Sequence, residues 1–121
     1  MEENDYVRTK DGEILKIDSF EKDCLNIDCV CFTTGEIYTE ELLKEILTKH
    51  SKNIIDLIEV GDIVNGYIVL DVMEDLQTGE IHLEMPSSYP KEGSCAIYND
   101  DIKTILTHEQ YNSNCYKVKG E

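Results

Sequence analysis

Cysteine is the strongest metal ligand and nucleophile in this 121-residue sequence, and the chain has five: Cys24, Cys29, Cys31, Cys95 and Cys115. A structural zinc site normally uses C-x2-C pairs or a matched pair of histidines, and Cys29-x-Cys31 is a poor match to that spacing. In a strand, Cys29 and Cys31 would point to one face together with Leu25 and Ile27. Free cysteine behaves there as a small hydrophobic residue, so we expect buried, reduced thiols and no metal site.

The three histidines, His50, His82 and His108, share no motif with each other or with a cysteine. The sequence contains no H-E-x-x-H helix, no serine nucleophile elbow and no glycine-rich phosphate loop. Carboxylates are so numerous that no pair of them stands out as a general acid and base. We therefore expect no catalytic residues, no cofactor and no enzymatic activity.

Acidic side chains are the most unusual chemical feature. The chain carries 26 acidic residues against 11 basic ones, a formal net charge of −15, and no lysine or arginine lies between Asn53 and Pro90. The acids of this window that we assign to a partner-binding face are Glu59, Asp62, Asp71, Glu74, Asp75, Glu80 and Glu84. Such a face attracts a basic protein and repels nucleic acid and anionic membranes. A purely solvated acidic surface and a divalent-cation site are the alternatives for the same residues.

Basic residues suggest a different function. Arg8 is the only arginine, and Lys10 and Lys16 lie near it in the sequence. Phosphate recognition relies on such side chains. The alternative prediction is therefore an oligomeric small-molecule binder that sequesters a nucleotide immune signal through Arg8, Lys10 and Lys16.

The first half of the chain predicts a hairpin and a helix. Two β-rich runs, 6–9 and 13–17, flank an Asp-Gly turn that ends at Gly12, and a second strand pair is expected within 25–38. A helix is expected over about 39–50, with Thr39 as its N-cap and acidic residues in its first turn. A short strand or helical turn should follow at 54–58.

The second half predicts more short strands. Asn65-Gly66 separates two β-branched runs, which is a strong hairpin signal, and a second turn is expected around Thr78-Gly79. Residues 81–85 alternate between apolar and polar, and a capping-box sequence predicts a short helix at about 107–113. Strands are also expected at 95–98, 102–106 and 115–118. The fold class is therefore α+β, a small, strongly bent or barrel-like antiparallel sheet in a single domain spanning residues 1–121.

Three blocks of sequence resemble a known group of proteins. They are the YVRTK segment from Tyr6 with Gly12, the HSKNIIDLIEVGD segment from His50 with the following VNGY, and the IKTI, EQ and YKV segments from Ile102 to Val118. Together they resemble a family of small uncharacterised phage and prophage proteins of Gram-positive bacteria. The family has no catalytic residues to carry over, so the resemblance implies a genetic setting rather than a mechanism.

These observations lead to one functional expectation. No stretch approaches the ~20 apolar residues of a membrane span, and no secretion signal is visible, so we expect a protein of the host bacterial cytoplasm. The expected function is inhibition of a host defence protein, as in an anti-CRISPR protein, by an acidic surface that imitates nucleic acid. The expected partner is a basic, nucleic-acid-binding defence protein such as a CRISPR nuclease. A structural or regulatory phage protein is a further alternative.

Overall fold

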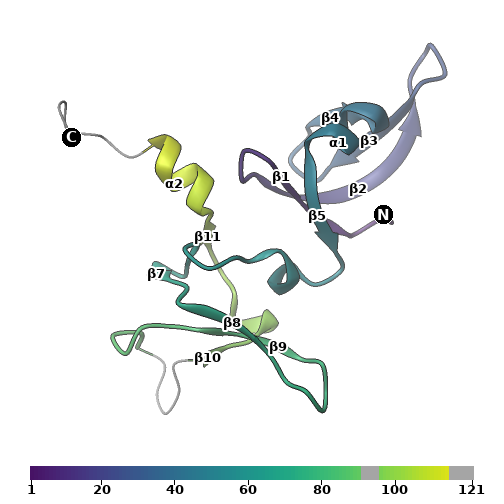
Figure 1. Cartoon of the computed structure of the whole chain (residues 1–121). Coiled ribbons are helices and arrows are strands. Elements are labelled where there is room, and N and C mark those ends of the chain that lie inside the picture. Colours follow the sequence, from purple (N-terminus) through teal and green to yellow (C-terminus); the bar gives the residue numbers. More distant parts are fainter. Residues whose placement is uncertain (91–95, 115–121) are drawn as a thin grey trace. The chain divides into compact units, whose positions relative to one another are not determined.

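The computed structural model describes residues 1–90 and 96–114 of the chain. The chain divides into two compact units, Met1–Leu57 and Ile58–Glu121, which are treated separately below as unit 1 and unit 2. Both contain antiparallel sheet and one α-helix (Figure 1), so the expected α+β class is confirmed. The single-domain expectation stays a prediction, because compactness alone does not show whether a unit folds independently.

Unit 1 is built around one five-stranded antiparallel sheet. Its elements are β1 (Tyr6–Thr9), β2 (Ile14–Lys22), β3 (Asp28–Phe32), β4 (Ile37–Thr39), α1 (Glu40–Ile46), β5 (Leu47–Ser51) and the 3-10 turn η1 (Ile54–Leu57). The strand order is β4-β3-β2-β1-β5, so the last strand returns to the first. The pairing of the long strand β2 with β3 shifts between Ile17 and Ser19. Such an irregularity bends a strand locally. In the described part of the chain the strands form three sheets, not the one small sheet expected, and its bent or barrel-like shape stays a prediction.

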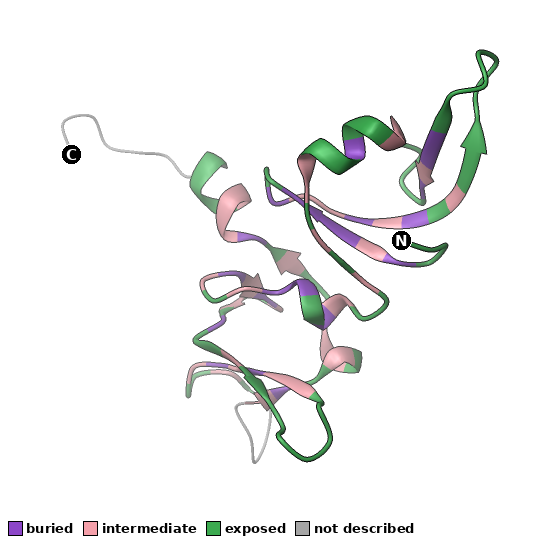
Figure 2. Ribbon diagram, turned by 45° about the vertical axis from the view of Figure 1, so that its right-hand side comes forward, coloured by how far each residue is buried: buried purple, intermediate pink, exposed green. Residues whose placement is uncertain are grey.

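The core of unit 1 follows from the alternation of its strands. Inward-facing aliphatic and aromatic side chains from β1, β2 and β3 meet one leucine of α1. The buried cluster is Val7, Leu15, Ile17, Val30, Phe32 and Leu43. Figure 2 shows the same distribution as buried segments on the strands and a mostly exposed helix surface. The β1–β2 hairpin has its predicted turn, with Gly12 at φ 81° and the Thr9 N–H donating to the Glu13 carbonyl at 3.0 Å.

The predicted helix at 39–50 is only half correct. Thr39 is the N-cap, as expected, and its hydroxyl accepts a hydrogen bond from the Leu42 N–H at 3.2 Å. The helix ends at Ile46, however, and residues 47–51 form β5 against β1. The free edge of β1 offers this segment a full set of backbone partners, and tertiary pairing outweighs local helix propensity.

The prediction for the cysteines also needs correction. Strand β3 begins only at Asp28, and both Leu25 and Ile27 are exposed, so no apolar face includes them. Core contacts are made by the alternate residues Val30 and Phe32. Cys29 is buried on the opposite face, Cys31 is half-buried, and Cys24 is exposed. Cys95 and Cys115 lie outside the described residues.

Unit 2 consists of much shorter elements. They are β6 (Ile63–Val64), β7 (Tyr67–Ile68), β8 (Asp71–Glu74), β9 (Ile81–Glu84), β10 (Ala96–Ile97), the 3-10 turn η2 (Asn99–Asp101), β11 (Ile105–Leu106) and α2 (His108–Asn114). They form two three-stranded antiparallel sheets, β10-β9-β8 and β11-β6-β7. The predicted Asn65-Gly66 hairpin is confirmed, with φ values of 53° and 88° that suit a tight turn. The strand expected at 115–118 lies outside the described residues.

Helix α2 begins as the capping-box sequence predicts. The Thr107 hydroxyl accepts from the Gln110 N–H at 3.4 Å, and the Gln110 side-chain oxygen accepts from the Thr107 N–H at 3.3 Å. Within residues 1–90 and 96–114, neither α1 nor α2 has the length and hydropathy needed to cross a bilayer.

Candidate functional site: the acidic hairpin

Strands β8 and β9 form a hairpin that carries most of the acids expected at the partner-binding face. We call the segment Asp71–Glu84 the acidic hairpin. Its register pairs Asp71 with Glu84, Met73 with His82, and Glu74 with Ile81. Five of the predicted acids therefore belong to one continuous structure: Asp71, Glu74, Asp75, Glu80 and Glu84.

The tip of the acidic hairpin is held by its own side chains. The Asp75 carboxylate accepts hydrogen bonds from the N–H groups of Gln77 at 2.8 Å and Thr78 at 3.1 Å. The Thr78 hydroxyl accepts from the Glu80 N–H at 3.2 Å, and Gly79 takes the positive φ of 73° that closes the turn. The tip is thus ordered before any partner arrives, which lowers the entropic cost of binding.

Hydrogen bonding also keeps Asp75 charged. The N–H donors of Thr78 and Gln77 hold the pKa of the Asp75 carboxyl below its usual range. Hydrogen bonds to the ionised form of a carboxylate favour that form. The charge at the tip therefore persists to lower pH than that of an ordinary exposed aspartate.

One face of the hairpin combines acids with exposed apolar groups. Directly paired residues share a face, and residues two apart along a strand point to the same face. Asp71 and Glu84 therefore lie on the same side of the sheet as Met73 and His82. Tyr98, which follows β10, packs its ring 5.7 Å from that of His82. We call these five residues the outer face; the opposite face carries Val72 and the buried Leu83. Met73 and Tyr98 are each 41% exposed although they lie in the middle of a polar surface.

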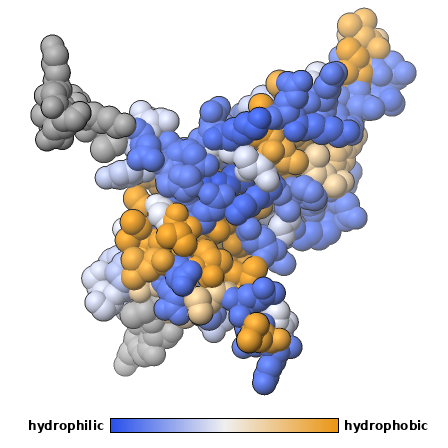
Figure 3. Space-filling model, viewed as in Figure 1, coloured by the Kyte–Doolittle hydropathy of each residue, from blue (hydrophilic) through white to orange (hydrophobic). Residues whose placement is uncertain are grey.

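The apolar residue at the tip is more exposed still. Leu76 is 100% exposed, between Asp75 and Gln77. Figure 3 shows a separate hydrophobic group at the free end of this hairpin, surrounded by hydrophilic ones. A leucine wholly in water on a tip already ordered by other residues contributes nothing to the fold of that tip. Burial of this side chain by a partner would be favourable, because it removes apolar surface from water.

The structure separates two of the predicted acids from this surface. Asp62 is fully buried, so its assignment to a partner-binding face does not fit the fold. Its carboxylate accepts from the N–H groups of Glu59 at 2.7 Å and His108 at 2.8 Å, which are 49 residues apart. Glu59 is half-buried and lies beside His108 rather than on the acidic hairpin.

The basic residues of the alternative prediction are also dispersed. Arg8 is fully buried, and its guanidinium donates to the Leu57 carbonyl at 2.9 Å within unit 1. Arg8 therefore ties β1 to η1 and does not present its charge to a phosphate. Lys10 is exposed, whereas Lys16 lies over the Tyr6 ring at 5.6 Å. A role for Lys10 or Lys16 in ligand binding stays a prediction.

Sequence reasoning missed the apolar part of the site. The period-two alternation at 81–85 correctly places His82 away from the core, and its partner Met73 would have followed from the register of the hairpin. Leu76 carries no such signal, because a leucine next to a turn looks the same whether it folds inward or outward. Tyr98 is brought to this face only by the pairing of β10 with β9.

No protein-family model matches the chain, and no curated protein or solved structure matches it either.

Proposed function

We propose that this protein is a binding protein that inhibits a basic, nucleic-acid-binding partner by docking the acidic hairpin on it. A host defence protein such as a CRISPR nuclease is the partner class that the phage-like sequence setting favours. The observation that carries the proposal is the fully exposed Leu76 on an ordered tip flanked by acids, in a stretch of 38 residues, Asn53–Pro90, without a lysine or arginine.

The placement of acidic residues on the acidic hairpin supports a binding role for this surface. Asp71 and Glu84 stand directly opposite each other, and like charges at opposed positions destabilise a sheet. A basic partner would relieve that repulsion. Successive side chains of a strand point to opposite faces, so the acids that act together are those on one face, such as the paired Asp71 and Glu84. Their carboxylates can take the place of phosphates in a basic groove.

Composition of the outer face supports a protein rather than a metal ion or a small molecule as the partner. Tyr and Met are enriched at the cores of protein interfaces, where they bury large areas. Met73 and Tyr98 on the outer face and Leu76 at the tip provide such area. The surrounding acids provide the polar rim and electrostatic steering.

A paired set of charge reversals tests this proposal. The first variant replaces Asp71, Glu74 and Glu80 with lysine and keeps Asp75, which orders the tip. The matched variant replaces the exposed acids Asp18, Glu41 and Glu45 of unit 1, so both variants change the net charge equally. Each is purified with an affinity tag from a Gram-positive host, and the recovered partner is then measured for binding with and without competing duplex DNA.

The proposal expects the partner to bind the wild type and the unit 1 variant, to be lost from the hairpin variant, and to be displaced by DNA and by salt. Leu76→Ser should weaken the same complex by roughly tenfold or more, because full burial of a leucine side chain contributes about 1.5–3 kcal/mol. Equal binding by both charge variants would contradict the proposal. A nucleotide released on denaturation, in place of a protein, would support the sequestering alternative.

A further inference from the structure

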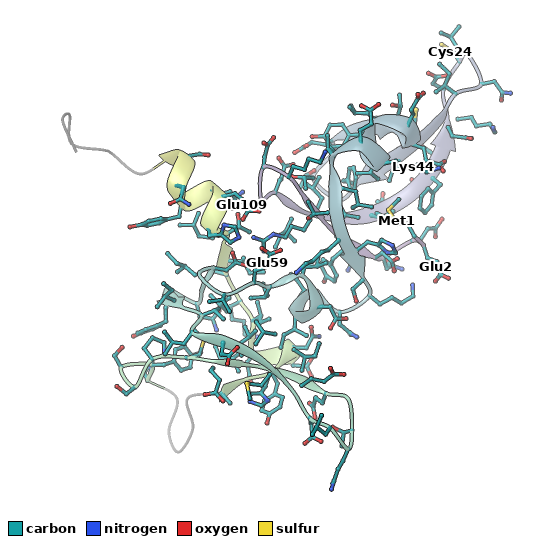
Figure 4. All side chains as sticks on the ribbon, viewed as in Figure 1. Met1, Glu2, Cys24, Lys44, Glu59 and Glu109 are labelled. Atoms are coloured by element: carbon teal, nitrogen blue, oxygen red, sulfur yellow. The ribbon has the colours of Figure 1, made fainter. Side chains whose placement is uncertain are left out.

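Glu59, His108 and Glu109 bring their side chains to one point in unit 2, away from the acidic hairpin. The Nε2 atom of His108 lies 2.9 Å from a carboxylate oxygen of Glu59 and 3.0 Å from one of Glu109. The three potential ligand atoms all lie within 4.8 Å of one another. Figure 4 labels Glu59 and Glu109 next to each other beside the start of α2. All three residues are half-buried.

The arrangement is fixed by a buried group behind it. The fully buried Asp62 carboxylate accepts from the backbone N–H groups of both Glu59 and His108. Gly61, next to Asp62, has a φ of 94°, a backbone conformation that favours glycine and that a side chain would strain. The backbones that carry two of the three groups are thus held by the same carboxylate, as second-shell residues hold metal ligands.

The balance of charge and donors at this cluster suits a cation. An imidazole Nε2 carries at most one hydrogen, yet two carboxylate oxygens lie within 3.0 Å of it. The two carboxylates also repel each other, in a protein of net charge −15. A divalent cation at this point would take the place of the single shared proton and neutralise both carboxylates.

We infer that Glu59, His108 and Glu109 form a binding site for a divalent first-row transition metal of the zinc type. One imidazole nitrogen and two carboxylate oxygens are suitable zinc ligands, and three protein ligands leave a fourth tetrahedral position for water. Zinc ligands at bond lengths of about 2.0–2.2 Å lie roughly 3.4 Å apart, which is a few tenths of an ångström more than the two distances from Nε2 and within the 4.8 Å that bounds all three atoms. The imidazole ligand disfavours magnesium and calcium, which prefer oxygen ligands alone.

The test uses zinc and cobalt as probes on the full-length, chelator-stripped, reduced protein. Zinc binding is measured by calorimetry for the wild type, Glu59→Gln, His108→Asn and the control Glu80→Gln, which removes the same charge from the acidic hairpin. Circular dichroism verifies that each variant is folded. Glu59→Gln is the more informative variant if His108→Asn does not fold, because it keeps the backbone contacts of Asp62.

The inference expects one zinc ion per chain in the wild type and Glu80→Gln, and an affinity at least about tenfold weaker in Glu59→Gln and His108→Asn. Zinc affinity should fall as the pH falls, because the imidazole must be deprotonated to bind the metal. Cobalt should give the visible spectrum of a tetrahedral nitrogen and oxygen site. Absence of saturable zinc binding, equal affinity in Glu59→Gln and the wild type, or a thiolate-to-cobalt absorption band would overturn it.

Discussion

Units 1 and 2 contain similar elements but are stabilised in different ways. In unit 1, strands of up to nine residues pair along most of their length and bury an apolar cluster that includes Val7, Ile17 and Phe32. In unit 2, several strands are only two residues long, and polar side chains bind backbone groups of distant segments. Asp62 and Asn65 are the main examples. Unit 2 also buries apolar side chains, among them Val64, Leu83 and Ile97, but specific polar residues join its short strands in addition.

The largest effect should come from the core of unit 1. Leu43 is the buried residue of α1, and Leu43→Ala should reduce the free energy of unfolding by about 3 kcal/mol through lost burial and a cavity. Urea denaturation measures the loss, and hydrogen exchange should show it in peptides from residues 1–57. The exposed neighbour Leu42 is the control, since Leu42→Ala should cost much less. Equal losses for the two variants would mean that α1 does not pack as described.

Asp62→Ala should be the most damaging polar substitution in unit 2. It removes the buried carboxylate that accepts from two partly buried backbone N–H groups, and we expect a loss of about 2 to 3 kcal/mol. The exposed Asp71 is a control for charge, and Asp71→Ala should stay within ~0.5 kcal/mol of the wild type. If Asp62→Ala and Asp71→Ala reduced the free energy of unfolding equally, the polar contacts of Asp62 would not stabilise unit 2 as described.

Asn65 separates the contribution of backbone conformation from that of hydrogen bonds. Its amide oxygen accepts from the N–H groups of Lys103 at 2.8 Å and Thr104 at 3.1 Å, and its φ is 53°. Asn65→Ala should cost about 2 kcal/mol, because it loses these bonds and strains the left-handed backbone. Asn65→Gly keeps the favourable conformation and should cost roughly 1 kcal/mol less than the alanine variant in thermal denaturation. Equal costs for the two variants would show that conformation contributes nothing.

Capping of α1 provides a smaller test in unit 1. Thr39→Ala removes the side-chain acceptor for the Leu42 N–H and should reduce stability by about 1 kcal/mol. Thr39→Ser keeps the hydroxyl and should recover most of that loss in the same urea titration. A serine variant as weak as the alanine variant would point to packing of the threonine methyl group instead.

The smallest expected effect depends on pH. Asp5 accepts hydrogen bonds from the Lys52 ammonium at 3.0 Å and from the Glu2 N–H at 3.0 Å, and the Lys52 bond is the main cause of its lowered pKa. A lowered pKa stabilises the fold above the unfolded value near 3.8, and that stabilisation disappears as the pH falls through the folded value. Asp5→Asn should thus be less stable than the wild type at pH 7 and should approach it below pH ~4. A difference that stays constant from pH 7 to pH 3 would contradict this assignment.

Local signals predicted most of the turns but not the long-range pairings. Asp11-Gly12, Asn65-Gly66 and Thr78-Gly79 fixed their hairpins because few residues tolerate positive φ. The change from helix to strand at Leu47 could not be predicted, because it depends on the free edge of β1. The burial of Arg8 was equally hidden, since its acceptor at Leu57 is 49 residues away.

The candidate sites show the same division. A sequence window without basic residues was enough to locate the acidic hairpin, because charge density along a chain is a local property. The cluster of Glu59 with His108 was not predictable, because two single residues of common type form no motif. Asp62 was assigned to the surface for the same reason: an aspartate gives no sign that distant N–H groups will surround it.

The tip of the acidic hairpin separates the residues that set its shape from those that face outward. Asp75, Thr78 and Gly79 provide the bonds and the backbone geometry, whereas the side chains of Leu76 and Gln77 take no part in the hydrogen bonds described for the tip. Substitutions at 76 and 77 can therefore accumulate without unfolding the loop. On the docking function proposed above, these two positions could change to fit a different partner while the scaffold stays the same.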